Sequence, residues 1–258
     1  MIYATILFFI LLVLGIPVAF TIGISGFVFF VLSDFLPVSI GVQNVASVSQ
    51  SFPLLAVPFF VLAGHLLNES GITERLFAFS RVVVGWLAGG LAQVSVVLST
   101  LMGGVSGSAV ADAAMEARVL GPTMIKEGYS KGYTASVIAI SSLITSTIPP
   151  SLGLILYGYV GNVSIGQLLM AGIVPGLLMM MVLMFTSFVI ARKRGYKATD
   201  AKIPTAKEVL RATWAAKWAL LFPILLLVAI RGGLFTPSEV GTFAVIYAII
   251  VGMAAHRE

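Results

Sequence analysis

A run of small and polar residues, Gly103 to Asp112, interrupts an apolar segment and could hold a cation and a carboxylate together. Ser106 and Ser108 offer the hard hydroxyl oxygens that a sodium ion takes. A helix broken there leaves free carbonyl groups at one end and free amide groups at the other, an arrangement that transporters use. The helix dipole favours the Asp112 carboxylate in the first turns of the second helix. Two alternatives stay open: small residues that only permit close helix packing, and an Asp112 that caps a helix or pairs with Arg118.

A second interruption surrounds a double proline and carries several hydroxyl groups. Proline lacks an amide hydrogen and frees upstream carbonyl groups, which an ion site at membrane depth requires. A simple proline kink stabilised by hydroxyls is the alternative. We predict one substrate and ion site between the two breaks, formed by Gly104, Ser106, Gly107, Ser108, Asp112, Ser141, Ser142, Thr145, Ser146, Thr147, Ile148, Pro149, Pro150 and Ser151.

The composition predicts an all-α polytopic membrane protein. The chain of 258 residues is 59% hydrophobic and 10% charged, with a mean hydropathy of +1.08. Its formal net charge is +5, but eight of the fifteen basic residues lie between Arg192 and Lys217, which is typical of a cytoplasmic loop. This placement argues against nucleic-acid binding. Cysteine is absent, which excludes disulfides and thiolate metal sites. The apolar run from Met1 is interpreted as an uncleaved first helix.

Three regions are expected to position the site. Residues 1–87 form a scaffold-type region with two short crossings in 2–33 and an amphipathic arm over 72–86, which suits the membrane surface. An ordinary short connection is the alternative for that arm. Residues 88–192 form a transport-type region, and residues 193–258 hold the basic loop, a second surface helix and two further crossings. Outside the transport-type region, crossings are expected at 52–68, 220–230 and 240–254, and a polar piece at 43–51.

The transport-type region is predicted to begin with a re-entrant hairpin over about 91–120, because each arm is too short to span a bilayer. A broken transmembrane helix over about 133–160 and a helix over 165–191 follow. Glu116 and Arg118, towards the feet of the hairpin, are expected at the membrane interface. In the last region two capping boxes are predicted to start helices, at Thr205–Glu208 and at Thr236–Glu239.

Six runs stand out in order along the chain: Gly15 to Phe20, Phe52 to Pro58, Gly104 to Ala113, Ile148 to Ser151, Ala171 to Gly176 and Gly233 to Glu239. Together they resemble the large membrane subunit of TRAP transporters, the tripartite ATP-independent periplasmic transporters, in its dicarboxylate-type family. The resemblance implies one half of an elevator-type secondary transporter of the bacterial inner membrane. Such a permease imports an organic acid, is driven by sodium as coupling ion, uses no other cofactor and is not an enzyme. The partners implied are a small membrane subunit and a periplasmic substrate-binding protein.

The same resemblance implies a sodium site at the hairpin tip and the neighbouring broken helix. This chain departs from the family at Thr145-Ser146, where the family usually has Gly-Pro. Family members also carry a second, inverted half. The chain is therefore expected to be a fragment, a split gene that needs a partner chain, or a half that pairs with itself. The residues carried over as sodium ligands, partly through backbone carbonyls, are Ser106, Gly107, Ser108, Thr145, Ile148 and Pro150.

Two rival functions come from other classes. One is a non-transporting scaffold or degenerate half-subunit, favoured by the missing second half. The other is an intramembrane serine protease, because Gly104-Val105-Ser106-Gly107 fits a rhomboid-like pattern. A serine nucleophile needs a base within hydrogen-bonding reach, and the chain offers only His65 and His256.

Overall fold

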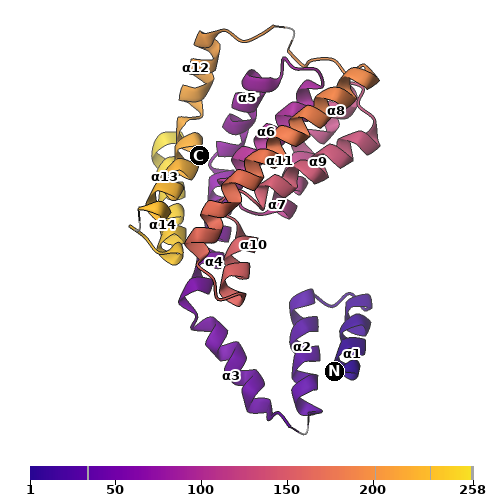
Figure 1. The fold of residues 1–258 in the computed structure, drawn as a ribbon, viewed down its shortest axis with the longest axis vertical. Helices are drawn as coiled ribbons and strands as arrows, with labels where there is room; N and C mark the ends of the chain where they lie inside the picture. The colour runs from indigo at the N-terminus through magenta and orange to yellow at the C-terminus, as the bar shows by residue number, and fades with distance from the viewer. Residues whose placement is uncertain (34, 201, 233, 257–258) are drawn as a thin grey trace. The chain divides into compact units, whose positions relative to one another are not determined.

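The computed structural model describes residues 1–33, 35–200, 202–232 and 234–256, and all regular structure within them is helical. The chain divides into two compact units, residues 1–52 and 53–258, and each is described by itself. Figure 1 traces the order of the helices along the chain. The expectation of an all-α protein is confirmed for the described part of the chain.

The first unit contains three helices, α1 (Ile2–Val13), α2 (Val18–Val31) and α3 (Val38–Ser49). Gly15, with a φ of 78°, and Pro17, the N-cap of α2, separate the first two helices. Residues 2–33, where two short crossings are predicted, therefore contain two helices. Most of the polar piece over 43–51 is helical, because α3 continues to Ser49. Helix α3 is exposed along most of its length, so its polar residues meet no burial cost.

The second unit contains eleven α-helices over its described residues. A 3-10 turn at Phe52–Leu55 leads into the first of them, and a π-helical turn at Val251–His256 continues the last. The helices are α4 (Ala56–Glu69), α5 (Ile72–Val84), α6 (Gly90–Gly103), α7 (Ala109–Val119), α8 (Gly121–Lys126), α9 (Lys131–Thr145), α10 (Leu152–Val160), α11 (Ile165–Arg194), α12 (Ala206–Ala215), α13 (Lys217–Arg231) and α14 (Pro237–Ile250).

Side-chain caps set the starts of several helices. Both predicted capping boxes are confirmed: Thr205 and Glu208 exchange hydrogen bonds at the start of α12, and Thr236 and Glu239 do so at the start of α14. In each box the threonine hydroxyl accepts from the backbone amide three residues on, and the glutamate accepts from the threonine amide, so two free helix donors are satisfied. At the second break, the Ser151 hydroxyl accepts from Leu154 N at 3.2 Å and caps α10.

Helix α6 lies at the centre of the second unit. Leu91, Val94 and Leu98 are at most 1% exposed, because α6 packs against α5, α9 and α11. Figure 1 shows α6, α9 and α11 side by side. Helix α7 packs mainly against α9, while α4 packs against α14. The helix that enters the first break and the helix that leaves it therefore share α9 as a common support.

Only α11 is by itself long and apolar enough to cross a membrane, judged by length and composition over the described residues. It has 30 residues, or about 45 Å at 1.5 Å per residue. Helices α12 and α13 pass the same test together but are bent by 70° at their junction. The expected crossing over 165–191 thus has a matching helix. The segments predicted as crossings at 52–68, 220–230 and 240–254 are helical but shorter.

The helix expected at the membrane surface over 72–86 is α5, which ends at Val84. Ile72, Leu76, Ser80 and Val84, spaced four residues apart, form its buried side. Helix α12 packs against α5, so the two amphipathic helices support each other.

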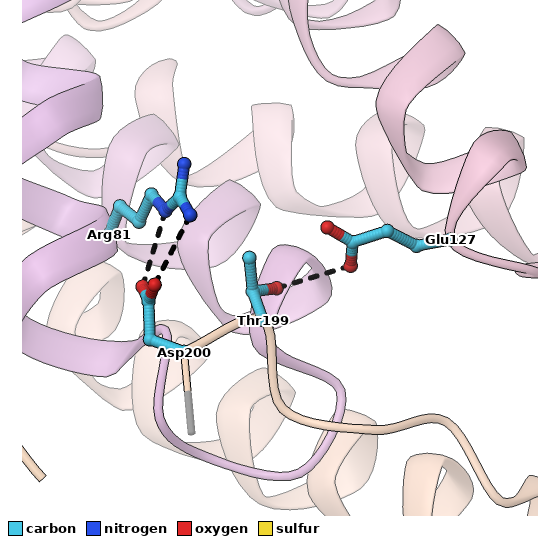
Figure 2. A network of polar contacts seen from close by, with 4 residues as sticks. All are labelled: Arg81, Glu127, Thr199 and Asp200. Carbon is cyan, nitrogen blue, oxygen red and sulfur yellow. Dashed lines mark hydrogen bonds and ion pairs between the residues drawn. The ribbon is translucent and has the colours of Figure 1, made fainter. Parts of the chain in front are cut away.

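The linker that follows α11 contacts residues at the ends of α5 and α8, as Figure 2 shows. Arg81 on α5 forms a two-pronged contact with Asp200, with Nε–Oδ2 and Nη2–Oδ1 distances of 3.2 and 3.1 Å. This hydrogen-bonded carboxylate raises the pKa of Arg81. The Thr199 hydroxyl donates to Glu127 Oε2, just beyond α8, at 3.3 Å, and the Thr199 amide donates to Gly85 O at 3.0 Å. The linker therefore joins the end of α5 to the end of α8.

Candidate functional site

The first break is a five-residue tip between α6 and α7, residues 104–108. Helix α6 ends at Gly103, and Gly107 has a φ of +60°, a left-handed conformation that glycine adopts without a steric penalty. Ser108 is the N-cap of α7, and its hydroxyl accepts from Ala111 N at 3.4 Å. The Ser106 hydroxyl donates to Met102 O at 3.4 Å. Both serines of the tip are partly exposed.

The second break lies directly against this tip. A Cβ atom added at Gly107 would overlap the carbonyl oxygen of Pro150, and one added at Gly103 would lie 2.9 Å from Ile148 Cβ. The bond between Pro149 and Pro150 is cis. Glycine at these two positions permits backbone contact that a larger residue would prevent. The carbonyl of Pro150 is thus held at the tip.

Helices from other parts of the second unit close around the two breaks. Pro223 of α13 would lie 2.5 Å from a Cβ atom at Gly104, and a Cβ atom at Gly64 of α4 would lie 3.4 Å from Ser106 Cα. Helix α11 packs closely against the second break, since a Cβ atom at Gly172 would overlap the carbonyl oxygen of Thr147. Three further helices, α4, α11 and α13, therefore meet the breaks through glycine or proline.

A buried hydrogen bond joins the two broken helices. The Thr145 hydroxyl lies 2.6 Å from Asp112 Oδ2 and 2.8 Å from Ser99 O. Asp112 is only 1% exposed, and its second oxygen, Oδ1, has no hydrogen-bond partner. The alternative that Asp112 pairs with Arg118 is not what the structure describes, because Arg118 is exposed on another side of α7. Asp112 instead connects α7 to the end of α9.

Glu116 corrects one expectation from the sequence. Its predicted place was the membrane interface, but it is 0% exposed and faces α6 and α9. Ser95 donates to Glu116 Oε2, and Ser99 donates to Oε1 at 2.7 Å. The Ser141 hydroxyl lies 2.9 Å from that of Ser95. The four-residue spacings, Asp112 to Glu116 and Ser95 to Ser99, place each pair on one helix face and were the signal that sequence reasoning overlooked.

The other predicted residues of the second break make local contacts. Ser142 donates to Ala139 O, and Ser146 and Thr147 both donate to Leu143 O. Ser151 is buried and donates to Ser146 O. Pro149 and Pro150 are also buried. The structure therefore brings together the tip, Thr145 and the range from Ile148 to Ser151. Ser141 instead belongs to the hydrogen-bond network of Glu116, and Ser142 forms a hydrogen bond within its own helix.

The arrangement required for a serine protease is absent from the described contacts. The Ser106 hydroxyl donates to a backbone carbonyl, and the exposed side chain of His65 forms no described hydrogen bond with it. The side chain of His256 lies outside the described residues. A nucleophile needs a hydrogen-bonded base, so the geometry gives no support to this rival.

Two helix breaks in contact inside an apolar helical chain are an arrangement that membrane transporters use. The model of the family described as "Tripartite ATP-independent periplasmic transporter, DctM component" matches residues 5–258. The chain therefore belongs to this TRAP transporter family, whose members are membrane permeases.

Individual relatives agree with this family. An isethionate TRAP transporter permease protein of Oleidesulfovibrio alaskensis is 36% identical over 97% of this chain and 39% of its own length. A sialic acid TRAP transporter large permease protein of Vibrio cholerae is 37% identical over 96% of this chain and 57% of its own. A C4-dicarboxylate TRAP transporter large permease protein of the same species is 33% identical over 96% and 54%. The chain thus spans about half the length of these relatives.

Proposed function

We propose that this chain forms part of the large permease subunit of a sodium-coupled secondary transporter that imports an organic acid. The observation that carries the proposal is the contact between the two breaks, where Gly107 touches the carbonyl of Pro150. In transporters, broken helices supply carbonyl oxygens for an ion and helix N-termini for an anionic group. The N-terminal amides of α7 would face the substrate carboxylate.

The proposed sodium ligands are the tip residues Ser106, Gly107 and Ser108 with Thr145, Ile148 and Pro150. Two features support this choice. Ser106 and Ser108 are partly exposed and can reach an ion, and the oxygen of Pro150 is fixed at the tip. Asp112, one helical turn beyond Ser108, adds a negative charge near a cation. The six sodium ligands are all in this chain, whereas the complete substrate site would also use the part of the relatives that this chain does not span, from the same polypeptide or from a second chain.

The rest of the proposal extends from the relatives. Their names give isethionate, sialic acid and C4-dicarboxylate, all organic acids, so we assign a carboxylate or related acid as the substrate class. The word "large" in two of these names supports a small membrane subunit as partner. A periplasmic binding protein would deliver the substrate, and the location would be the bacterial inner membrane. In this scheme α6 and α7 form a re-entrant hairpin that moves in an elevator-type step.

The proposal is tested by the thermal stability of the purified chain in detergent. Sodium is titrated against potassium and choline at constant ionic strength. A ligand that binds only the folded state raises stability, by about 2.7 kcal/mol at 100 times its dissociation constant. We expect a sodium-specific rise in the wild type that is lost in Ser106→Ala.

Ser136→Ala is the matched control, because the exposed Ser136 hydroxyl only donates to Gly132 O. This variant should keep the sodium response. An equal rise in all three salts, or none in any, would contradict an ion site formed by this chain and favour a scaffold role.

A further inference from the structure

Glu116 is a completely buried carboxyl group that the proposed sodium and substrate site does not use. It lies on α7 one helical turn after Asp112 and is covered by α6 and α9. Its hydrogen-bond partners, Ser95 and Ser99, are also 0% exposed. The carboxyl group is therefore separated from both water and lipid by protein atoms.

No positive charge compensates this group. An ionised carboxylate in a protein interior costs several kcal/mol unless a cation pairs with it. Across the described residues no basic side chain forms an ion pair with Glu116, and Asp112 on the same face of α7 would add repulsion. Helix α6 has no ionisable side chain. The ionisable groups of the helices packed around Glu116 are Asp112 and the exposed Arg118 on α7, the exposed Lys126 on α8, and Tyr133 and the exposed Lys131 near the start of α9.

The surrounding hydroxyl groups fit a neutral carboxylic acid. With an ionised Glu116 the Ser95 hydroxyl donates to Oε2. A proton on Oε2 reverses this hydrogen bond, so that Glu116 donates to Ser95 and the Ser95 hydroxyl donates to Ser141 at 2.9 Å. Ser141 in turn donates to Ile138 O at 3.2 Å, and Ser99 donates to Glu116 Oε1 at 2.7 Å. Every donor in this series of hydrogen bonds has an acceptor, and the series ends on a backbone carbonyl. The network needs no buried charge.

We propose that Glu116 is a proton-binding site, occupied while α6, α7 and α9 are packed as described. The ligand is a hydrogen ion, and the site is separate from the proposed sodium ligands. Occupancy follows from burial and contacts alone. Release of the proton during transport would rest on the proposed function, because it requires α7 and α9 to separate enough to admit water.

Infrared spectroscopy of the purified full chain tests the occupancy directly. At neutral pH we expect the carbonyl stretching band of a protonated carboxylic acid, shifted by transfer to heavy water. Glu116→Gln should remove this band, since glutamine keeps the shape and one donor of the neutral acid. Glu127→Gln is the control: Glu127 is exposed, and its variant should leave the band unchanged. Asp112→Asn shows whether the neighbouring Asp112 carboxyl group contributes to the same infrared band.

Absence of the band in the wild type at neutral pH would overturn the proposal, and this result needs no variant. A band that survives in Glu116→Gln but disappears in Asp112→Asn would overturn it as well. Neither measurement uses sodium, so the outcome is independent of the salt titration that tests the transport function.

Discussion

Replacement of Gly107 by alanine is expected to force the two helix breaks apart. The new Cβ atom would overlap the carbonyl oxygen of Pro150, whereas real Cβ atoms essentially never come within 3.0 Å of such a neighbour. The atom that must move is part of the backbone, next to the buried cap Ser151, so no side-chain rotation can relieve the overlap.

Two costs add at this position. A non-glycine residue in the left-handed conformation costs about 1–2 kcal/mol. Displacement of packed backbone costs a further 1–3 kcal/mol or so, as in overpacked cores. The sum is about 2–5 kcal/mol, and each kcal/mol corresponds to about 2–4 °C in the unfolding midpoint of a chain of this size.

Gly195 provides the matched control. Its φ is +72°, but a Cβ atom there would meet nothing within 4 Å. Gly195→Ala should therefore lower the midpoint by the conformational cost alone. Thermal unfolding of both variants in detergent measures the difference. Equal midpoints for the two variants would refute the claim that the tip and the Pro150 carbonyl are in contact.

Two further experiments test the hydrogen bond between Thr145 and Asp112 and the ion pair between Arg81 and Asp200. Thr145→Val removes the hydroxyl bonded to buried Asp112 and should cost about 1–3 kcal/mol, measured by thermal unfolding. Thr186→Val, whose exposed hydroxyl donates to Val182 O within α11, should cost much less, and equal losses would contradict the Asp112 bond. The ion pair of Arg81 and Asp200 is 48% and 41% exposed, so a double-mutant cycle should give a coupling of about 0–1 kcal/mol that declines in high salt. A coupling insensitive to salt would argue against this surface pair.

Local signals allowed much of the fold to be predicted. Capping boxes and prolines act within a few residues, so Thr205, Thr236 and the double proline fixed helix starts and breaks that could be located in the sequence. Helix α3 was missed because its polar residues break the apolar pattern, although nothing in Val38–Ser49 opposes a helix. A periodic apolar face is the main helical signal, and an exposed helix in a small unit lacks it.

The candidate site was predictable as two breaks but not as a network. The tip and the double proline are unusual in an apolar chain, whereas Ser95 and Ser99 are ordinary residues of a buried helix. Their role depends on Glu116, which comes from another helix, and such pairing is a tertiary property. The approach of Pro223 to Gly104 is equally long-range. Helix propensity and hydrophobic periodicity describe local structure, so they cannot predict contacts between residues that lie far apart in the sequence.

The unequal helix lengths described above have a consequence for how the protein is made. Helices α6, α7, α9 and α10 have 14, 11, 15 and 9 residues, below the roughly 20 that an independent membrane crossing needs. Insertion machinery that sorts nascent segments by hydrophobicity and length would not release them singly into lipid. Helix α11 packs against α6, α9 and α10. We therefore expect translation to finish α11 before the four short helices leave the translocon together.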